Sequence, residues 1–190
     1  GVAGICPFAG DRDPQPIVDA RCSDSRAFGQ LAEFTVLDGR QYRSAQPNND
    51  VRSTLNDAAL NPESTMLGAE QRNWLKQSLI QSRGTWNILA QQVMMGMVGM
   101  PSGDIPMTYS MDQWPGYTHE RIDLIRFMAD RKINNPVVLT GDNHMNWANE
   151  LRVDDRKMDT PVVATEIVGT SIASGGDGED LSLIHISEPT

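Results

Sequence analysis

An aspartate and a histidine that follow one apolar segment are the residues best suited to chemistry. Asp142 and His144 come after the segment 137–140 (Val-Val-Leu-Thr) and Gly141. This pattern predicts a buried strand that stops at a glycine turn, and side chains two residues apart at a strand end lie on one side. A carboxylate beside an imidazole suits iron, zinc or manganese. The alternative for so short a motif is a turn-capping aspartate and a histidine at the rim.

Two predicted helices precede apolar segments and would position such a turn. Residues 67–79 and 118–132 carry apolar side chains at three- and four-residue spacing, which is the pattern of an amphipathic helix. An apolar segment follows each of them and another lies further along, so strands are predicted at residues 86–90, 137–140 and 161–168. Helices that alternate with strands indicate an α/β fold, in which binding clefts lie at the carboxyl ends of the strands.

A second group of polar residues lies just before the first predicted helix. Asp38, Arg40, Tyr42 and Arg43 alternate along what the pattern predicts to be a strand and its exit. An arginine here could reach a substrate phosphate, because its planar guanidinium matches phosphate oxygens. We favour a structural ion pair between Asp38 and an arginine, since arginine–carboxylate forks are common structural devices.

Other chemically suggestive side chains favour structural roles. Gln91 or Gln92 could bind calcium through an amide oxygen, but a hydrogen-bonded loop amide is the simpler interpretation. Trp114 and Tyr117 could wall a pocket, although packing around a turn is the commoner use of such residues. The methionines around a predicted loop at residues 96–106 could form a Cu(I) site, but methionines more often fill gaps in cores.

Composition limits the partners that the chain can have. The 190 residues carry a net charge of −9, which argues against nucleic acid because its phosphates need a basic face. Small phosphate esters remain suitable partners, since metal ions can supply positive charge locally. No apolar run is long enough to span a bilayer, and the spacing of Cys6 and Cys22 fits no zinc pattern. No feature of the sequence indicates an oligomeric state.

The motifs and their order resemble the PhoD-like family, also called the alkaline phosphatase D family, of the metallophosphoesterase superfamily. The matching segments are residues 28–34 leading into 37–43, 67–75, 86–95, 112–117 with Arg121, 139–144 with 147–148, and 169–171. Six such motifs in the family's order are hard to explain by chance. Pro115 departs from the usual acidic residue and Asn143 from the usual aliphatic one, and neither change removes a predicted ligand.

The resemblance implies a fold, an activity and a set of cofactors. The fold would be α/β, the C-terminal part of a four-layer metallophosphoesterase sandwich in which helices flank mixed sheets. The activity would be that of a metal-dependent phosphatase or phosphodiesterase with an alkaline optimum, in which metal-activated water attacks phosphorus in line. Iron with calcium are the implied metals, and export from the cell is implied by analogy. Asp142 and His144 match the family's last metal motif and are the predicted ligands.

The resemblance also divides the chain into three parts. Residues 1–26 match poorly and are either a divergent loop or the product of a frameshift. Residues 27–180 are predicted to be the C-terminal part of a PhoD-like metallophosphatase domain. Residues 181–190 resemble the in-frame translation of a transposon-based sequencing adapter, so we expect the native sequence to stop near Asp180.

Most metal ligands of the family lie in an N-terminal half that has no match in this sequence. We therefore expect the chain by itself to bind the catalytic metals weakly and to show no appreciable turnover. The alternative is a non-catalytic binding module that keeps the fold with a degenerate metal site.

Overall fold

The computed structural model describes residues 24–171, which form an α/β structure with one large mixed sheet. The elements are β1 (Asp24–Phe28), β2 (Ala32–Val36), η1 (Pro47–Asp50), α1 (Gly68–Gln81), β3 (Trp86–Ala90), β4 (Met100–Ser102), β5 (Ile105–Thr108), η2 (Trp114–Tyr117), α2 (Thr118–Asp130), β6 (Pro136–Thr140), β7 (Trp147–Leu151) and β8 (Ala164–Val168). The predicted α/β class is confirmed. Among the described residues, no helix is both long and apolar enough to cross a membrane.

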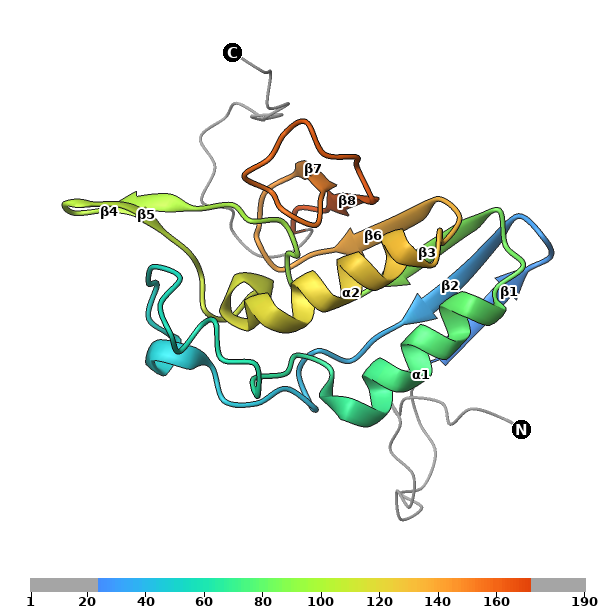
Figure 1. Ribbon diagram of the computed structural model, residues 1–190, viewed down its shortest axis with the longest axis horizontal. Helices are drawn as coiled ribbons and strands as arrows, with labels where there is room; N and C mark the ends of the chain where they lie inside the picture. Colours follow the sequence, from blue (N-terminus) through green and yellow to red (C-terminus); the bar gives the residue numbers. More distant parts are fainter. Residues whose placement is uncertain (1–23, 172–190) are drawn as a thin grey trace.

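The large sheet has six strands in the order β1-β2-β3-β6-β8-β7. Its four central strands β2, β3, β6 and β8 run parallel, while the edge strands β1 and β7 are antiparallel to their neighbours. The arrowheads of β2, β3 and β6 consequently point to the same side (Figure 1). The loops that follow β2, β3, β6 and β8 meet there, and we call this side the carboxyl edge. The hairpin of β4 and β5 lies within the chain that follows β3.

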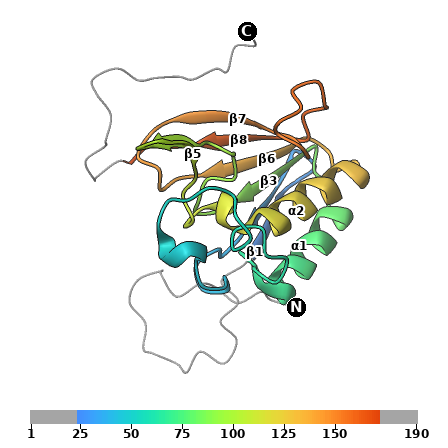
Figure 2. The ribbon, with the colours of Figure 1, turned by 60° about the vertical axis from the view of Figure 1, so that its left-hand side comes forward.

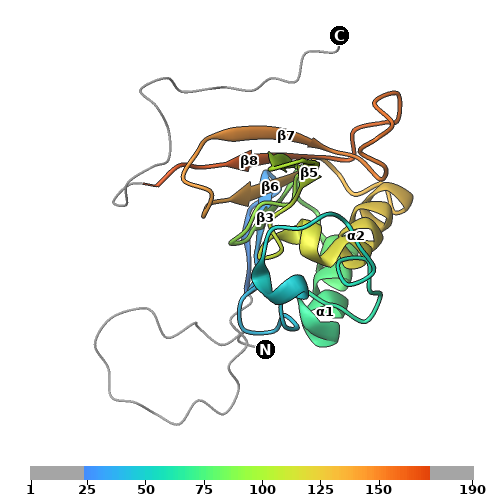
Figure 3. The same cartoon turned by 90° about the vertical axis from the view of Figure 1, so that its left-hand side faces the viewer.

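Helices α1 and α2 lie side by side on one face of the large sheet (Figures 1 and 3). Lys76 of α1 joins the two helices: its Nζ lies 2.6 Å from Oδ2 of Asp123 on α2 and 5.2 Å from the ring centre of Phe127. Each helix starts near the carboxyl edge, because it follows a parallel strand and leads back into the next one. Both helix N-termini therefore lie on the same side of the molecule as the loops of that edge (Figure 2).

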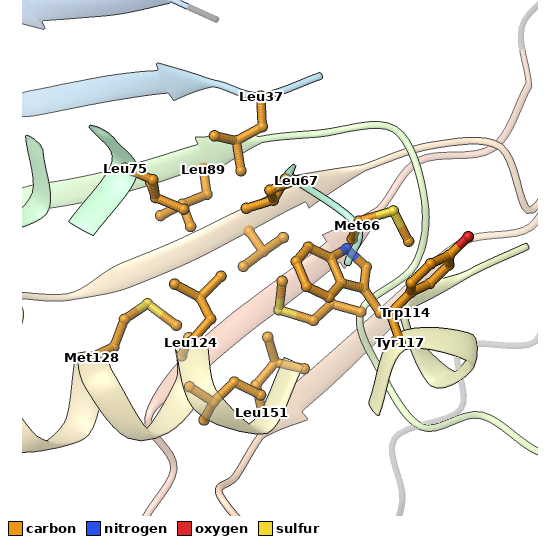
Figure 4. Close-up of a cluster of buried hydrophobic side chains, with 14 of the residues drawn as sticks. Leu37, Met66, Leu67, Leu75, Leu89, Trp114, Tyr117, Leu124, Met128 and Leu151 are labelled. Carbon is orange, nitrogen blue, oxygen red and sulfur yellow. The ribbon is translucent and has the colours of Figure 1, made fainter. Parts of the chain in front are cut away.

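The hydrophobic core fills the space between the sheet and the two helices (Figure 4). Leu89 of β3 and Val138 of β6 are fully buried, and so are Leu75 of α1 and Leu124 of α2. Burying a side chain of this kind contributes roughly 1.5–3 kcal/mol. This packing fixes the distance from strands to helices and thereby sets the position of every loop at the carboxyl edge.

The opposite face of the sheet is also apolar, and no helix among residues 24–171 covers it. In register across the strands, this face presents Val36 of β2, Leu139 of β6 and Ile167 of β8. Val36 is 39% exposed, Ile167 is 44% exposed, and Trp86 at the start of β3 is 44% exposed. Parallel sheets are normally covered on both faces. The described residues therefore build a six-stranded sheet with a helical layer on one face, together with the two-stranded sheet of β4 and β5.

Both predicted helices and all three predicted strands are confirmed within a few residues. The edge strands β1 and β7 and the central strand β2 were not predicted as strands. The predicted loop at residues 96–106 is wrong in part, because β4 and β5 pair within it as an antiparallel hairpin. Strand β1 spans the predicted boundary between residues 26 and 27.

Candidate functional site

The turn after β6 holds the two predicted metal ligands in an unusual backbone conformation. Asp142 has φ 69° and His144 has φ 58°, both in the left-handed region. Side chains other than glycine rarely adopt these angles, and residues that do so cluster at functional sites. The N–H of Asn143 donates to the carbonyl of Gly141 at 2.9 Å, which closes the turn. The carboxylate and the imidazole are thus presented from one tight turn at the carboxyl edge.

The loop after β8 anchors this turn from the neighbouring strand. Thr170 donates from its Oγ1 to the carbonyl of His144 at 2.9 Å, and from its N–H to Oδ1 of Asn146 at 3.0 Å. The N–H of Gly169 donates to the carbonyl of Thr140 at 2.8 Å. The segment 169–171, which is the last of the family-like motifs, therefore lies beside the turn that carries both predicted ligands.

Two arginines from the loop after β2 complete the carboxyl edge. Arg40 Nη1 lies 2.7 Å from Oδ2 of Asp112, and Arg40 Nη2 lies 3.3 Å from Oδ1 of Asp142. Arg43 Nη1 lies 2.8 Å from Oδ1 of Asp112, and Gln46 Nε2 donates to the same oxygen at 3.0 Å. A chain of alternating charges therefore connects the loop after β2 to the turn after β6.

The prediction that Asp38 forms an ion pair with one of these arginines is wrong, because they pair with a different carboxylate. Oδ1 of Asp38 accepts hydrogen bonds from the backbone N–H groups of Arg40 at 2.9 Å and Gln41 at 2.8 Å. Such bonds favour a turn, which is why residues 38–43 do not continue β2 as the predicted strand. The arginines pair instead with Asp112, which lies more than sixty residues further along the chain.

Asp112 is held as a carboxylate by its partners. Burial raises the pKa of Asp112, but hydrogen bonds from Arg40, Gln46 and Arg43 outweigh burial, and the pKa lies below its ordinary value. The two arginines keep a negative charge at Asp112, and Asp112 in turn keeps them at the carboxyl edge. Sequence reasoning did not single out this aspartate, although it lies in the matched segment 112–117.

The two glutamines at the end of β3 are hydrogen-bonded loop amides, as predicted. Gln92 accepts from the N–H of Gly39 at 2.7 Å and donates to the carbonyl of Leu37 at 2.6 Å. Gln91 donates to Oγ1 of Thr140 at 2.8 Å and accepts from Nε1 of Trp114 at 3.1 Å. They tie together the ends of β2, β3 and β6.

Trp114 and Tyr117 serve packing around a turn, as predicted. Both side chains are 0% exposed and belong to the core (Figure 4). The hydroxyl of Tyr117 donates to the carbonyl of Ser44 at 2.8 Å, which connects η2 to the loop after β2. Tyr117 therefore supports the loop that carries the arginines.

A buried glutamate that sequence reasoning missed supports the loop after β3. Glu166 of β8 is 0% exposed and accepts from the N–H groups of Met95 at 2.6 Å and Gly96 at 2.7 Å. It also accepts from Asn149 Nδ2 at 2.8 Å and from Thr140 Oγ1 at 3.0 Å. Burial raises the pKa of Glu166 above its ordinary value in spite of these hydrogen bonds. The available signal was a charged residue in a strand whose other members are Ala, Thr, Ile and Val.

The donor set at the turn suits a metal but is incomplete among the described residues. A carboxylate and an imidazole are common ligands of iron and zinc. Within residues 24–171, no three or more histidine, cysteine, aspartate or glutamate side chains come together in a way that could hold a metal ion. Cys6 and Cys22 lie outside the described residues. Asp142 and His144 thus fit two positions of a metal centre whose other ligands would come from elsewhere.

The fold and this edge define a class: an α/β protein that gathers carboxylates, arginines and an imidazole where parallel strands end. The chain belongs to the PhoD-like phosphatase family, whose model matches residues 8–190. It is similar to the alkaline phosphatase D of Bacillus subtilis (strain 168), with 46% identity over 153 residues, which are 80% of this chain and 26% of that protein. It is also similar to a solved structure of PhoD, with a TM-score of 0.79 and 43% identity over 85% of this chain and 31% of that one.

The family resemblance predicted from the motifs is confirmed. The chain spans less than a third of the length of both relatives. The ligand roles of Asp142 and His144, the iron and calcium cofactors, export and the three-part division of the chain stay predictions. Residues 181–190 lie outside the described part of the chain.

Proposed function

We propose that the chain is part of a metal-dependent hydrolase of phosphate esters, in which Asp142 and His144 are two of the metal ligands. The observation that carries this proposal is the left-handed turn after β6, which presents both side chains at the carboxyl edge of a chain from the PhoD-like family. Strained backbone at a strand end is costly, and it persists where a geometry is required.

The residues of the carboxyl edge would have different roles in such a hydrolase. Asp142 and His144 would hold metal, with iron and calcium as the proposed ions. A metal bound there would activate water and neutralise charge on the phosphoryl oxygens. Arg40 and Arg43 supply fixed positive charge beside the turn, although the chain as a whole is acidic. Both ligands must be deprotonated to bind, so metal affinity should fall in acid.

The chain by itself is proposed to bind metal weakly and to lack appreciable turnover. The support is the ligand count, because the described residues bring together no group of three or more candidate ligands. Structural metal sites need about four ligands and catalytic zinc sites about three. Tight stoichiometric metal binding with phosphate release by the purified chain would contradict this.

A chimera tests the proposed function directly. Residues 24–171 would replace the aligned segment of the Bacillus subtilis alkaline phosphatase D, and release of 4-nitrophenol from 4-nitrophenyl phosphate and from its diester would be measured. We expect Asp142→Ala and His144→Ala each to lower the rate by more than about 100-fold, because even changes next to metal ligands cost 10–100-fold.

The matched control is Asp154→Ala, which removes a partly exposed carboxylate from the loop after β7 and should leave the rate unchanged. Full activity of the chimera with Asp142→Ala would remove this residue from the metal site. A chimera that binds metal through Asp142 but never releases nitrophenol would favour the non-catalytic binding module.

A further inference from the structure

We propose that Arg40 is a phosphate-binding arm that a cation at Asp142 sets free. The guanidinium and the cation compete for the carboxylate of Asp142, and the nitrogen that loses this competition then binds a phosphoryl oxygen of the ester. The inference rests on the proposed function, because it requires Asp142 to be a metal ligand. It concerns a different residue, and its test separates the two.

The two ends of the Arg40 guanidinium have different roles in the structure. Nη1 donates to both oxygens of Asp112, at 2.7 and 2.8 Å. Nη2 reaches Oδ1 of Asp142 at 3.3 Å, which is longer than the 2.7–2.9 Å of a strong charge-assisted hydrogen bond. The contact with Asp112 is therefore the anchor, and the contact with Asp142 is the weaker one.

The anchor is itself held firmly. Asp112 accepts from Arg43 Nη1 at 2.8 Å and from Gln46 Nε2 at 3.0 Å. Arg43 also donates to the backbone carbonyl of Asp112 at 3.0 Å, and its side chain is 13% exposed. Asp112 thus stays in place whatever happens at Asp142, and Arg40 stays with it.

The contact between Arg40 and Asp142 is well suited to exchange. The two side chains are 38% and 43% exposed, and an ion pair with this exposure contributes little to stability. A cation bound by Asp142 would neutralise the carboxylate and repel the guanidinium. Nη2 would then keep two N–H donors beside the turn, still positioned by the anchor at Asp112. A guanidinium with free donors matches the oxygens of a phosphate group.

Two effects follow, and they have opposite signs. Removing the guanidinium removes a competitor, so a cation alone should bind Asp142 more tightly, by roughly twofold to fivefold for an exposed pair. Phosphate should tighten the cation further only when Arg40 is present, because the freed arm binds it. Coupling between two ligands is reciprocal, so the cation should tighten phosphate by the same factor.

The experiment uses the whole chain, with Mn²⁺ as the cation and inorganic phosphate as the anion. Free Mn²⁺ is counted by its electron paramagnetic resonance signal, with and without phosphate, for the wild type and for Arg40→Met. Arg156→Met is the matched control, because it removes an arginine from an exposed ion pair with Asp154 in another loop. Circular dichroism melting checks that each variant folds.

We expect Arg40→Met to bind Mn²⁺ roughly twofold to fivefold more tightly without phosphate and to lose the tightening that phosphate produces in the wild type. Asp112→Asn weakens the contact that positions Arg40 without removing the arginine itself. This variant should also lose that tightening. It provides the test if Arg40→Met does not fold. Equal or weaker Mn²⁺ binding by Arg40→Met, or tightening by phosphate that survives both changes, overturns the inference.

Asp142→Asn separates this inference from the proposed function. If Asp142→Asn weakens Mn²⁺ binding while Arg40→Met changes nothing, Asp142 remains a ligand and only the arm is wrong. If Mn²⁺ binding does not depend on Asp142, the ligand assignment fails, and the proposal for Arg40 fails with it.

Discussion

Two pairs of carboxylates in this molecule have nearly opposite surroundings. Glu120 and Glu166, which we call the buried pair, are at most 2% exposed and accept hydrogen bonds from backbone N–H groups. Asp112 and Asp142, which we call the edge pair, have side chains that are 24% and 43% exposed and face Arg40. All four are acids in a chain that is already acidic, so composition alone does not distinguish them.

The difference distinguishes the acids that hold loops in place from an acid that could exchange ligands. Glu120 accepts from the N–H groups of Met66 and Leu67 just before α1, and Glu166 accepts from those of Met95 and Gly96 after β3. Buried donors that lose such an acceptor cost free energy, so these contacts fix loops. The contact of Asp142 with Arg40 is partly in water and therefore cheap to exchange, in contrast to the firmly held contacts of Asp112. A site that takes up and releases ligands needs the second kind.

The largest expected effect comes from removing one member of the buried pair. Glu166→Ala leaves two backbone N–H groups, Thr140 and Asn149 without their acceptor, and we expect the free energy of unfolding to fall by roughly 3–5 kcal/mol. Urea unfolding of the purified chain measures this. Asp142→Ala is the comparison and should cost less than about 1 kcal/mol. Similar losses for the two variants would erase the distinction between the pairs.

A second change tests how closely the loop after β3 is fitted to Glu166. A Cβ at Gly96 would lie 2.5 Å from Nδ2 of Asn149 and 3.1 Å from Oε2 of Glu166. Gly96→Ala should therefore destabilise the chain by roughly 1–3 kcal/mol. Gly141→Ala is the control, because nothing lies within 4 Å of its Cβ. Thermal melting of both variants gives the comparison. Equal melting temperatures would show that the loop can shift to accommodate the added methyl group.

Stability should depend on pH through Glu166 with a definite sign. Burial raises the pKa of Glu166, so the carboxyl group of Glu166 binds its proton more tightly in the folded chain than in the unfolded chain. Its contribution to stability is fully present below the ordinary glutamate range and is lost as pH rises through the raised pKa. Glu166→Gln should remove this loss, which urea unfolding from acid to neutral pH would detect. An unchanged slope would contradict the raised pKa.

Asp112 should give the opposite and smaller dependence. Burial raises its pKa, but Arg40, Gln46 and Arg43 lower it more. A lowered pKa contributes stability that is present above the ordinary aspartate range and is lost as pH falls through the lowered pKa. Asp112→Asn should therefore flatten the acid side of the stability curve, by less than about 1 kcal/mol because the pair is partly exposed. An acid side that is unchanged in this variant would mean that the arginines do not stabilise the carboxylate.

Local pattern was enough to predict the parts of the fold that pack on the core. Apolar residues recur at helical spacing in α1 and α2 and at strand spacing in β3, β6 and β8. Burial of these residues in the core stabilises the elements that carry them. The edge strands β1 and β7 were missed because Asp-Ser-Arg-Ala-Phe and Trp-Ala-Asn-Glu-Leu are mixed sequences with no continuous apolar run. Their pairing comes from the neighbouring strand and not from their own composition.

The candidate site was assigned from the sequence only where it lies on one turn; for Arg40 and Arg43 a phosphate contact was one interpretation, but a structural ion pair was favoured. Asp142 and His144 follow a recognisable strand, so spacing was enough to single them out. Asp112 pairs with arginines about seventy residues earlier in the chain, and Glu166 with backbone amides about seventy residues earlier. Such contacts depend on which strands are neighbours in the sheet. No short sequence window contains that information.

The most direct test is whether Asp142 binds exchangeable ligands without contributing to the stability of the fold. Mn²⁺ binding and thermal melting would be measured side by side for the chain and for Asp142→Asn. We predict that Mn²⁺ affinity falls by at least about tenfold, the range that metal-site changes produce, while the melting temperature stays the same. Unchanged Mn²⁺ affinity, or a loss of affinity that merely follows a loss of folding, would contradict a ligand-exchanging role for Asp142.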